Sequence, residues 1–285
     1  MRNKLKRKTV FDTFKSKKYD IICLQETYIT YKDFEQWERE WGGLLFYSSV
    51  SSHSMGQVIL FKKGFPFDVT PIHVSDRVLA VSVKLDSYTA TITNVYAPVI
   101  ATEKQAFFTE LDTLLLSQPD EKIVCGDFNS VLDNDLDIIS GEPHRGREVE
   151  IFQAVLVNHS LNDAFRLFNP ECKAYTWCRK KPFIARRLDY ILCTDRIFDA
   201  TSYCQITSTP LSDHRVVELN YMLSHIKRGP SYWKFNDSLL YDITFAESMN
   251  DMTDNFLQDQ TQLDAQTKWD LLKVEIREFC ISYST

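Results

Sequence analysis

The sequence lacks any long run of apolar residues. No stretch approaches the length of a membrane-spanning helix, and the basic segment MRNKLKRKTVFDTFKSKKYD does not lead into the apolar core of a signal peptide. We therefore expect an intracellular protein without a membrane anchor, located in the nucleus, the cytoplasm or both. The basic segment has two interpretations, a nuclear-localisation signal or a solvated helix face.

Paired cysteine motifs and an excess of positive charge are also missing. The seven cysteines are scattered, no two form a C-x-x-C pair, and no histidine lies at ligand spacing from them. This pattern argues against a disulfide framework or a zinc module and indicates a reducing compartment. Because the formal net charge is -6, a polyanionic partner would have to be held by a local basic patch.

What the sequence does contain is a succession of short, strand-like runs bounded by turn residues: DIICLQ, GLLFYSSV, QVILF, VLAVSVKL, TATITNVYA, KIVCGDF, RLDYILC and VVELNYML. DIICLQ and KIVCG are continuously apolar, which is typical of central strands covered on both faces. Helical patterns occupy residues 6–16, 102–117, with Thr102 as the expected N-cap, and 147–158. Strands with interspersed helices predict an α+β sandwich of layered sheets.

The composition divides the chain into parts. Residues 1–224 carry the strand-like runs, and 225–235 form a linker that contains a Gly-Pro pair. Residues 236–285 show helical spacing of Leu, Ile, Phe and Trp. We therefore expect one large domain followed by a helical C-terminal appendage.

The segment LSDHR places Ser212, Asp213 and His214 on consecutive residues, which are the residue types of a hydrolase triad. Neighbouring side chains diverge, whereas the members of a working triad come from separate parts of the chain. No G-x-S-x-G elbow is present, which argues against a serine hydrolase. His214 is therefore expected to belong to a site whose other members lie elsewhere.

Polar side chains occur at the ends of several predicted strands. They are Gln25 and Glu26 in CLQET, Asn94 and Tyr96 in NVYAP, Asp127 and Asn129 in CGDFNS, and Asp189 in RRLDYIL. Carboxylates beside an amide, a phenol and an imidazole suit metal-assisted phosphodiester hydrolysis. Taken singly, each has an ordinary alternative as a turn, cap or core residue, and Asp189 could pair with Arg186 or Arg187. Only the ordered set indicates a site.

In the same order, LQET, NVYAP, GDFN, RLDYI and LSDH resemble the endonuclease/exonuclease/phosphatase superfamily, and within it the apurinic-like endonuclease of LINE-type non-LTR retrotransposons. The resemblance covers about residues 19–223. The later stretch GPSYWKFNDSLL resembles the segment that leads towards the reverse transcriptase in such proteins. The resemblance implies a DNase I-like, four-layer α/β/β/α sandwich with the site at one end of two packed sheets.

The resemblance also implies roles for the site residues. Asp127 and Asn129 would position and activate the attacking water, and Tyr96 with Asn129 would donate to phosphate oxygens. His214 would contact the scissile phosphate, and Asp189 would orient His214.

For the metal, the resemblance implies that Glu26 is a ligand and that Asp213 lies near enough to assist. Mg²⁺ fits better than zinc, because it keeps several waters and needs only one or two carboxylates, and no Cys/His ligand set is present. Mn²⁺ is an alternative.

DNA is the partner that the resemblance implies, and no obligate protein partner can be inferred from the sequence. Thr176 and Ser212 match positions that the family uses at the DNA backbone, although ordinary strand hydroxyls are an equal alternative. The stretch CRKKPFIARR corresponds to a hairpin that enters a DNA groove, and its candidate contacts are Lys180, Lys181, Arg186 and Arg187. A second strip, with Arg145 and Arg147, lies in GEPHRGRE. Either strip could instead be a solvated loop.

Two rival functions stay open at this point. One is a catalytically dead, retroelement-derived DNA-binding or interaction fragment, and the other is a phosphoinositide-type phosphatase of the same fold.

Family members begin with a strand that carries a metal-site Asn, whereas this sequence begins at the following basic helix, with Asn3 on the helix side. We therefore expect a chain without that first strand, with an impaired site.

Overall fold

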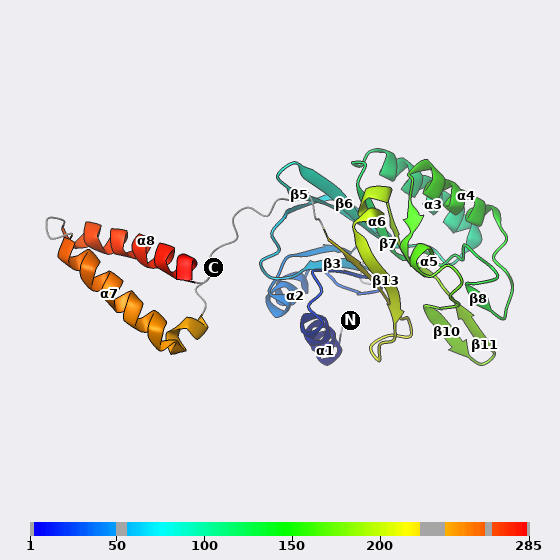
Figure 1. Cartoon of the computed structure of the whole chain (residues 1–285). Helices are drawn as coiled ribbons and strands as arrows, with labels where there is room; N and C mark the ends of the chain where they lie inside the picture. Colours follow the sequence, from blue (N-terminus) through cyan, green and yellow to red (C-terminus); the bar gives the residue numbers. More distant parts are fainter. Residues whose placement is uncertain (1–2, 50–55, 223–236, 260–263, 284–285) are drawn as a thin grey trace. The chain divides into compact units, whose positions relative to one another are not determined.

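The computed structural model describes residues 3–49, 56–222, 237–259 and 264–283. The chain divides into two compact units, residues 1–226 and 227–285. Figure 1 draws the chain with its helices and strands labelled. The predicted linker at 225–235 lies outside the described residues.

A six-stranded sheet forms one middle layer of the first unit. Its strand order is β4 (Asp68–Val74), β5 (Val78–Leu85), β6 (Tyr88–Tyr96), β7 (Lys122–Asp127), β12 (Asp189–Cys193) and β9 (Asn162–Asp163). Only β6 and β7 run parallel among these neighbours; the other pairs are antiparallel. Because β6 and β7 are parallel, their carboxyl ends meet at one edge of the sheet.

The second middle layer contains smaller sheets. One has the order β1 (Ile21–Leu24), β3 (Gln57–Phe61) and β2 (Leu45–Ser48), and another pairs β13 (Thr201–Thr207) with β14 (Val216–Tyr221). A separate small sheet, not assigned to either layer, joins β10 (Trp177–Lys180), β11 (Phe183–Arg186) and β8 (Ile138–Ile139). The first two strands of that sheet are the hairpin expected in CRKKPFIARR.

Helices cover the outer faces of the two layers. Helices α1 (Lys4–Ser16) and α2 (Phe34–Trp41) pack on the β1–β3–β2 sheet through a cluster that includes Phe11 and Trp37. On the six-stranded sheet lie α3 (Ala101–Leu116) and α4 (Arg147–Asn158), as Figure 1 shows. The shorter helices are α5 (Ala164–Phe168) and α6 (Asp195–Asp199).

The four layers follow from where the apolar side chains are buried. One cluster, with Ile59, Phe61, Leu79 and Val81, fills the space between the sheets. Another, with Phe108, Phe128 and Phe152 stacked ring on ring, joins α3 and α4 to the six-stranded sheet. The predicted α/β/β/α sandwich is therefore confirmed.

Every predicted strand and all three predicted helices of this unit form, but α3 begins at Ala101 after Ile100, so Thr102 is not its N-cap. The expectation that DIICLQ is central is wrong within the described residues, because β1 lies at the end of its three-stranded sheet. Its continuous apolarity has another cause: Ile22 packs towards α1 while Ile21 packs between the sheets.

The second unit is helical, as predicted. It consists of the 3-10 helix η1 (Asp237–Tyr241), α7 (Ile243–Asp259) and α8 (Ala265–Tyr283). Aromatic contacts among Phe245, Phe279 and Tyr283 join α7 to α8. Across the described residues of both units, no helix is long and apolar enough to cross a membrane.

Candidate functional site

Three strand ends of the six-stranded sheet bring polar residues to one edge. The parallel strands β6 and β7 end at Tyr96 and Asp127, which are paired in register. Strand β12 begins at Asp189, directly opposite Asp127 on its other side. The strand order therefore places a phenol and two carboxylates side by side.

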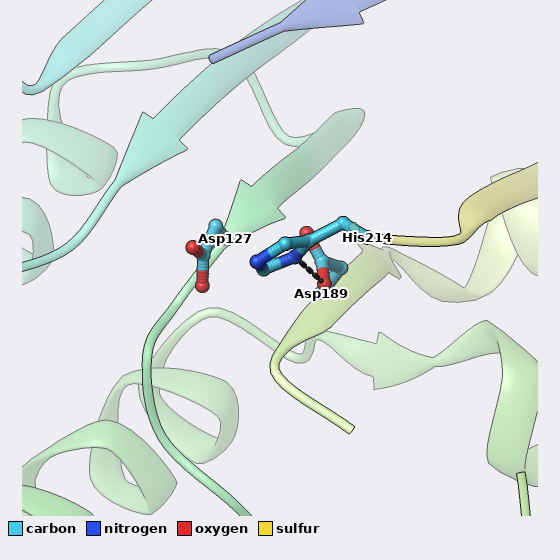
Figure 2. A group of neighbouring side chains, drawn as sticks. All are labelled: Asp127, Asp189 and His214. Atoms are coloured by element: carbon cyan, nitrogen blue, oxygen red, sulfur yellow. Dashed lines mark hydrogen bonds and ion pairs between the residues drawn. The ribbon is translucent and has the colours of Figure 1, made fainter. Parts of the chain in front are cut away.

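His214 joins this edge from the loop before β14. Its Nδ1 lies 2.8 Å from Asp189 Oδ2, so Asp189 is partnered by the histidine rather than by Arg186 or Arg187. One ligand atom from each of Asp127, Asp189 and His214 lies within 4.8 Å of the others (Figure 2). The carboxylate that partners the imidazole thus comes from another strand, and not from the adjacent Asp213.

Burial and neighbouring charges shift the pKa values of Asp127 and His214. Burial raises the pKa of Asp127 to about 7, and the neighbouring Asp189 carboxylate adds to the rise. Burial alone would lower the pKa of His214, but the hydrogen bond and charge of Asp189 outweigh it and raise the pKa to about 9. At neutral pH the imidazole therefore carries a proton, and Asp127 lies near its midpoint.

Glu26 reaches the same edge from the other sheet. It follows β1 with a left-handed backbone (φ 50°), and its Oε1 accepts the Tyr96 hydroxyl. Burial and then the hydrogen bond to Glu26 raise the pKa of Tyr96, so the phenol keeps its proton. The buried Asn94 donates to the carbonyls of Leu24 and Val58, so it links the two sheets below Glu26 rather than facing substrate.

A tight turn follows Asp127. The N–H of Asn129 donates to Asp127 Oδ1 at 2.8 Å, its Nδ2 donates to the Ala97 carbonyl at 2.9 Å, and its backbone is left-handed (φ 47°). Just before the turn, Gly126 has φ 135°, and a Cβ there would lie 2.1 Å from the Val95 carbonyl oxygen. Glycine is therefore required where β7 meets β6.

Thr176 holds the segments that carry Asp189 and His214. Its Oγ1 accepts the N–H groups of Leu188 (2.9 Å) and Asp189 (3.1 Å), and its carbonyl accepts the N–H of Arg215 (2.7 Å). The side chain is fully buried. The expectation that the Thr176 hydroxyl contacts DNA is therefore wrong, because this hydroxyl fixes backbone inside the protein.

Arg187 also differs from expectation. Its side chain is 1% exposed, and its Nη2 lies 2.7 Å from carboxylate oxygens of both Asp137 and Asp163. The guanidinium lies 4.4 Å from the centroid of the Tyr190 ring. Because this arginine is buried and ion-paired to two carboxylates, it is not available to DNA. Its assignment as a DNA contact is therefore wrong, and its role is to anchor the start of β12.

The other candidate DNA contacts lie at the surface or near it. Lys180 and Lys181 are exposed in the β10–β11 hairpin, and Arg145 and Arg147 are exposed before and at the start of α4. Arg186 is half-buried. One of its guanidinium nitrogens lies 2.8 Å from His144 Nε2, and the other donates to the Glu142 carbonyl at 3.2 Å.

Ser212 and Asp213 lie on the exposed loop before His214. The Ser212 hydroxyl accepts the His214 N–H at 3.1 Å, so it helps to shape the loop. Among the described residues, the group that could hold a metal contains Asp127, Asp189 and His214, and Asp213 is outside it. The structure therefore does not bring Asp213 to the metal-ligating group.

Sequence reasoning missed two residues beside the site. Lys104 of α3 is 5% exposed and donates to the Asn129 carbonyl, and His144 contacts Arg186. Burial, and then the charge of Arg186, lower the pKa of His144 to about 4, so it is neutral at neutral pH. No sequence signal singled out Lys104, because a lone lysine in an amphipathic helix is normally solvated.

The donor set at this edge suits a hard divalent cation. Asp127, Asp189 and His214 form the group whose ligand atoms lie close together. Glu26 is outside that group but adds a carboxylate at the same edge, where its Oε1 accepts the Tyr96 hydroxyl. Burial is the largest cause of the raised pKa of Asp127, and the charges of Asp189 and, to a smaller extent, Glu26 add to it. A cation at this edge would offset that part of the rise which comes from the neighbouring carboxylates. Oxygen ligands of this kind fit Mg²⁺.

A four-layer sandwich with carboxylates and an imidazole at one end of its packed sheets defines the class of DNase I-like nucleases and phosphodiesterases. The sequence profile of the Endonuclease/Exonuclease/phosphatase family matches residues 1–214. The chain belongs to this family.

One relative within reach of a sequence comparison is a transposon protein. The chain is 29% identical over 274 residues to the "Transposon TX1 uncharacterized 149 kDa protein" of Xenopus laevis, a match that covers 93% of this chain and 21% of that protein. The chain thus spans about a fifth of that relative's length.

Solved structures share the fold. One is the endonuclease domain of TRAS1, a telomere-specific non-LTR retrotransposon, with TM-score 0.60, 16% identity, and coverage of 78% of this chain and 95% of that one. Another is an AP endonuclease from Archaeoglobus fulgidus, with TM-score 0.62, 20% identity, and coverage of 75% and 93%. At these identities the likeness shows the fold alone.

Proposed function

We propose that the protein is a Mg²⁺-dependent DNA endonuclease that hydrolyses one strand of a target duplex during retrotransposition. The observation that carries the proposal is the Asp189–His214 pair facing Asp127 at the edge where Tyr96 and Glu26 also lie. The family and the transposon relative support it. The exposed lysines of the β10–β11 hairpin supply local positive charge on an acidic chain, as a DNA substrate requires.

The residues divide the chemistry among them. Asp127, in its deprotonated form, accepts a proton from the attacking water, and the turn to Asn129 fixes the direction of the carboxylate. The protonated His214 donates to a phosphate oxygen, and Asp189 holds the imidazole ring. Tyr96 keeps its proton and donates a hydrogen bond to Glu26, so its phenol orients that carboxylate at the site.

Glu26 would hold Mg²⁺ at this edge of the sheets, with Asp127 beside it as the base. When bound, the cation would polarise the phosphate and offset the excess negative charge of the carboxylates. Mn²⁺ takes similar oxygen ligands and is expected to replace it.

A plasmid assay tests the proposal. Supercoiled DNA is incubated with the protein and Mg²⁺, and conversion to the nicked circle is measured beside a chelator control and a Glu26→Ala variant. We expect nicking that the chelator and the substitution both abolish. Nicking that persists in Glu26→Ala would contradict the assigned metal residue, and no nicking by the parent protein would contradict the proposal.

The same preparation separates the endonuclease from a phosphatase of the same fold. Inositol phosphates are offered in place of plasmid, and released phosphate is measured. We expect no release, because the exposed basic hairpin suits a long phosphate backbone. Release of phosphate without plasmid nicking would favour the phosphatase.

A further inference from the structure

Lys104 is a buried cation that the proposed chemistry does not use. It lies in the first turns of α3, is 5% exposed, and its ammonium donates to the backbone carbonyl of Asn129. Burial lowers its pKa, while the charges of Glu148 and Asp127 act in the opposite direction. Burying a lysine is unfavourable unless its ammonium is hydrogen-bonded, so the contact with Asn129 is a specific one.

The carbonyl that Lys104 contacts belongs to a turn with a left-handed backbone at Asn129. Asparagine adopts this conformation more readily than most residues, but it is still less favourable than the right-handed regions, so surrounding contacts help to hold it. Two of those contacts come from Asn129 itself, through Asp127 Oδ1 and the Ala97 carbonyl. Lys104 supplies the third and ties the turn to the helix that covers the sheet.

We propose that Lys104 is a positioning residue that holds the Asp127–Asn129 turn in its working geometry. This inference rests on the proposed function, because it concerns the same site. Lys104 does not touch the reacting atoms; it acts through the Asn129 carbonyl. Without it, the turn keeps only two of these anchors, and Asp127 loses a fixed direction towards the attacking water.

The chain offers a matched control. Lys122 is also a buried lysine, 6% exposed, and burial lowers its pKa as well. It begins β7, whereas Asp127 ends that strand, so it lies at the far end from the site. A general effect of removing a buried lysine would therefore appear in both variants, and a positioning effect only at Lys104.

The kinetic test compares Lys104→Met, Lys104→Arg and Lys122→Met by steady-state nicking. We expect Lys104→Met to lose at least about tenfold in kcat with KM nearly unchanged, because substrate-binding groups are untouched. Lys104→Arg, which keeps a charged donor, should retain kcat within about threefold, and Lys122→Met should match the parent. Equal kcat in Lys104→Met and Lys122→Met would overturn the inference, as would equal losses in the Met and Arg variants.

A second readout does not need activity. Amide hydrogen exchange of Asn129 reports the N–H that donates to Asp127, and we expect its protection to fall at least about tenfold in Lys104→Met but not in Lys122→Met. Unchanged protection would overturn the inference. If the parent protein does not nick DNA but exchange changes as expected, the positioning role stands and the proposed function fails. If Lys104→Met does not fold, Lys104→Gln, which has a shorter side chain and no charge, takes its place in both measurements.

Discussion

At the scale of single residues, the charge state of His214 depends on one neighbour. Asp189 lies 2.8 Å from the imidazole, and the pKa of His214 is raised from 6.5 to about 9 against the opposing effect of burial. The Asp189→Asn substitution removes the negative charge that raises the pKa of His214, while the burial that lowers this pKa remains. The metal-free protein can be titrated with pH while the NMR signals of the His214 ring are recorded. We expect the midpoint of the ring titration to lie near pH 9 in the parent and well below pH 9 in the variant.

The sign of the linkage follows from the same shift. Because the folded pKa of His214 lies above its ordinary value, the pair stabilises the fold fully below about pH 6.5, and the contribution is lost as pH rises through about 9. The difference in unfolding free energy between the parent and Asp189→Asn should therefore shrink across that window. A difference that grows with pH would contradict the assignment.

The same substitution should affect nicking far more than folding. Asp189→Asn leaves the ring unoriented and less protonated, and we expect the nicking rate to fall by about 100-fold or more, the usual size of a lost acid–base contribution. Circular dichroism should be unchanged. If the variant nicks DNA at the parent rate, Asp189 does not orient His214.

Thr176 gives a residue-scale test with a conservative rescue. Thr176→Val removes the acceptor of two buried N–H groups, those of Leu188 and Asp189, and we expect it to destabilise the fold by about 1–3 kcal/mol. Thr176→Ser keeps the hydroxyl and should lose less. Denaturant unfolding of both variants measures the difference, and equal losses would show that the methyl group, not the hydroxyl, matters at this position.

At the scale of elements, the β10–β11 hairpin is the part of the candidate DNA surface that a binding experiment can isolate. Lys180→Glu with Lys181→Glu reverses two exposed charges, and each lost phosphate contact should lower the slope of log binding constant against log salt by about 0.9. Fluorescence anisotropy with a labelled duplex in a chelator measures this slope.

The matched control for the hairpin lies at the other end of the sheets. Lys63, which follows β3, and Lys84 of β5 are exposed and far from the strand ends that carry Tyr96 and Asp127. Lys63→Glu with Lys84→Glu makes the same change in net charge and should leave the slope near that of the parent. If both double variants flatten the slope equally, the effect comes from net charge, and the hairpin is not the DNA surface.

The sequence predicted elements well where periodicity and burial agree. The apolar runs that became β3 and β7 needed no tertiary information, and α4 has the predicted bounds. Helix α2 was not predicted, because its sequence consists largely of charged and polar residues and its buried apolar pair is only Trp37 and Trp41. The end position of β1 was missed because an apolar run reports covered faces and not which edges are paired.

Within the site, the sequence motifs predicted which side chains pair with each other, but they did not predict which side chains are buried. The pairing of Asp189 with His214 could be expected from the resemblance. The burial of Arg187 and Thr176 could not, because each depends on residues such as Asp137 and Leu188 that meet them only in the folded chain. A basic stretch in the sequence thus does not distinguish a DNA contact from a buried ion pair.

At the scale of the whole molecule, the two units differ in how much apolar surface they bury. The four hydrophobic clusters all lie before residue 226, as do all the site residues. Among the described residues of the second unit, the buried hydrophobic side chains are Phe245, Leu272 and Cys280. So small a core does not stabilise a fold by itself.

This imbalance predicts the effect of removing the second unit. A chain that ends at Ile226 keeps the four clusters and the site, so we expect its thermal midpoint to stay within about 3 °C of the full chain, which corresponds to less than about 1 kcal/mol. Its nicking rate should stay within about twofold, because no group assigned to the chemistry is lost. Calorimetry and the plasmid assay on the two chains measure both quantities. A midpoint lowered well beyond that range would show that the sandwich draws stability from α7 and α8, and a lost nicking rate with an unchanged midpoint would place a substrate contact in those helices.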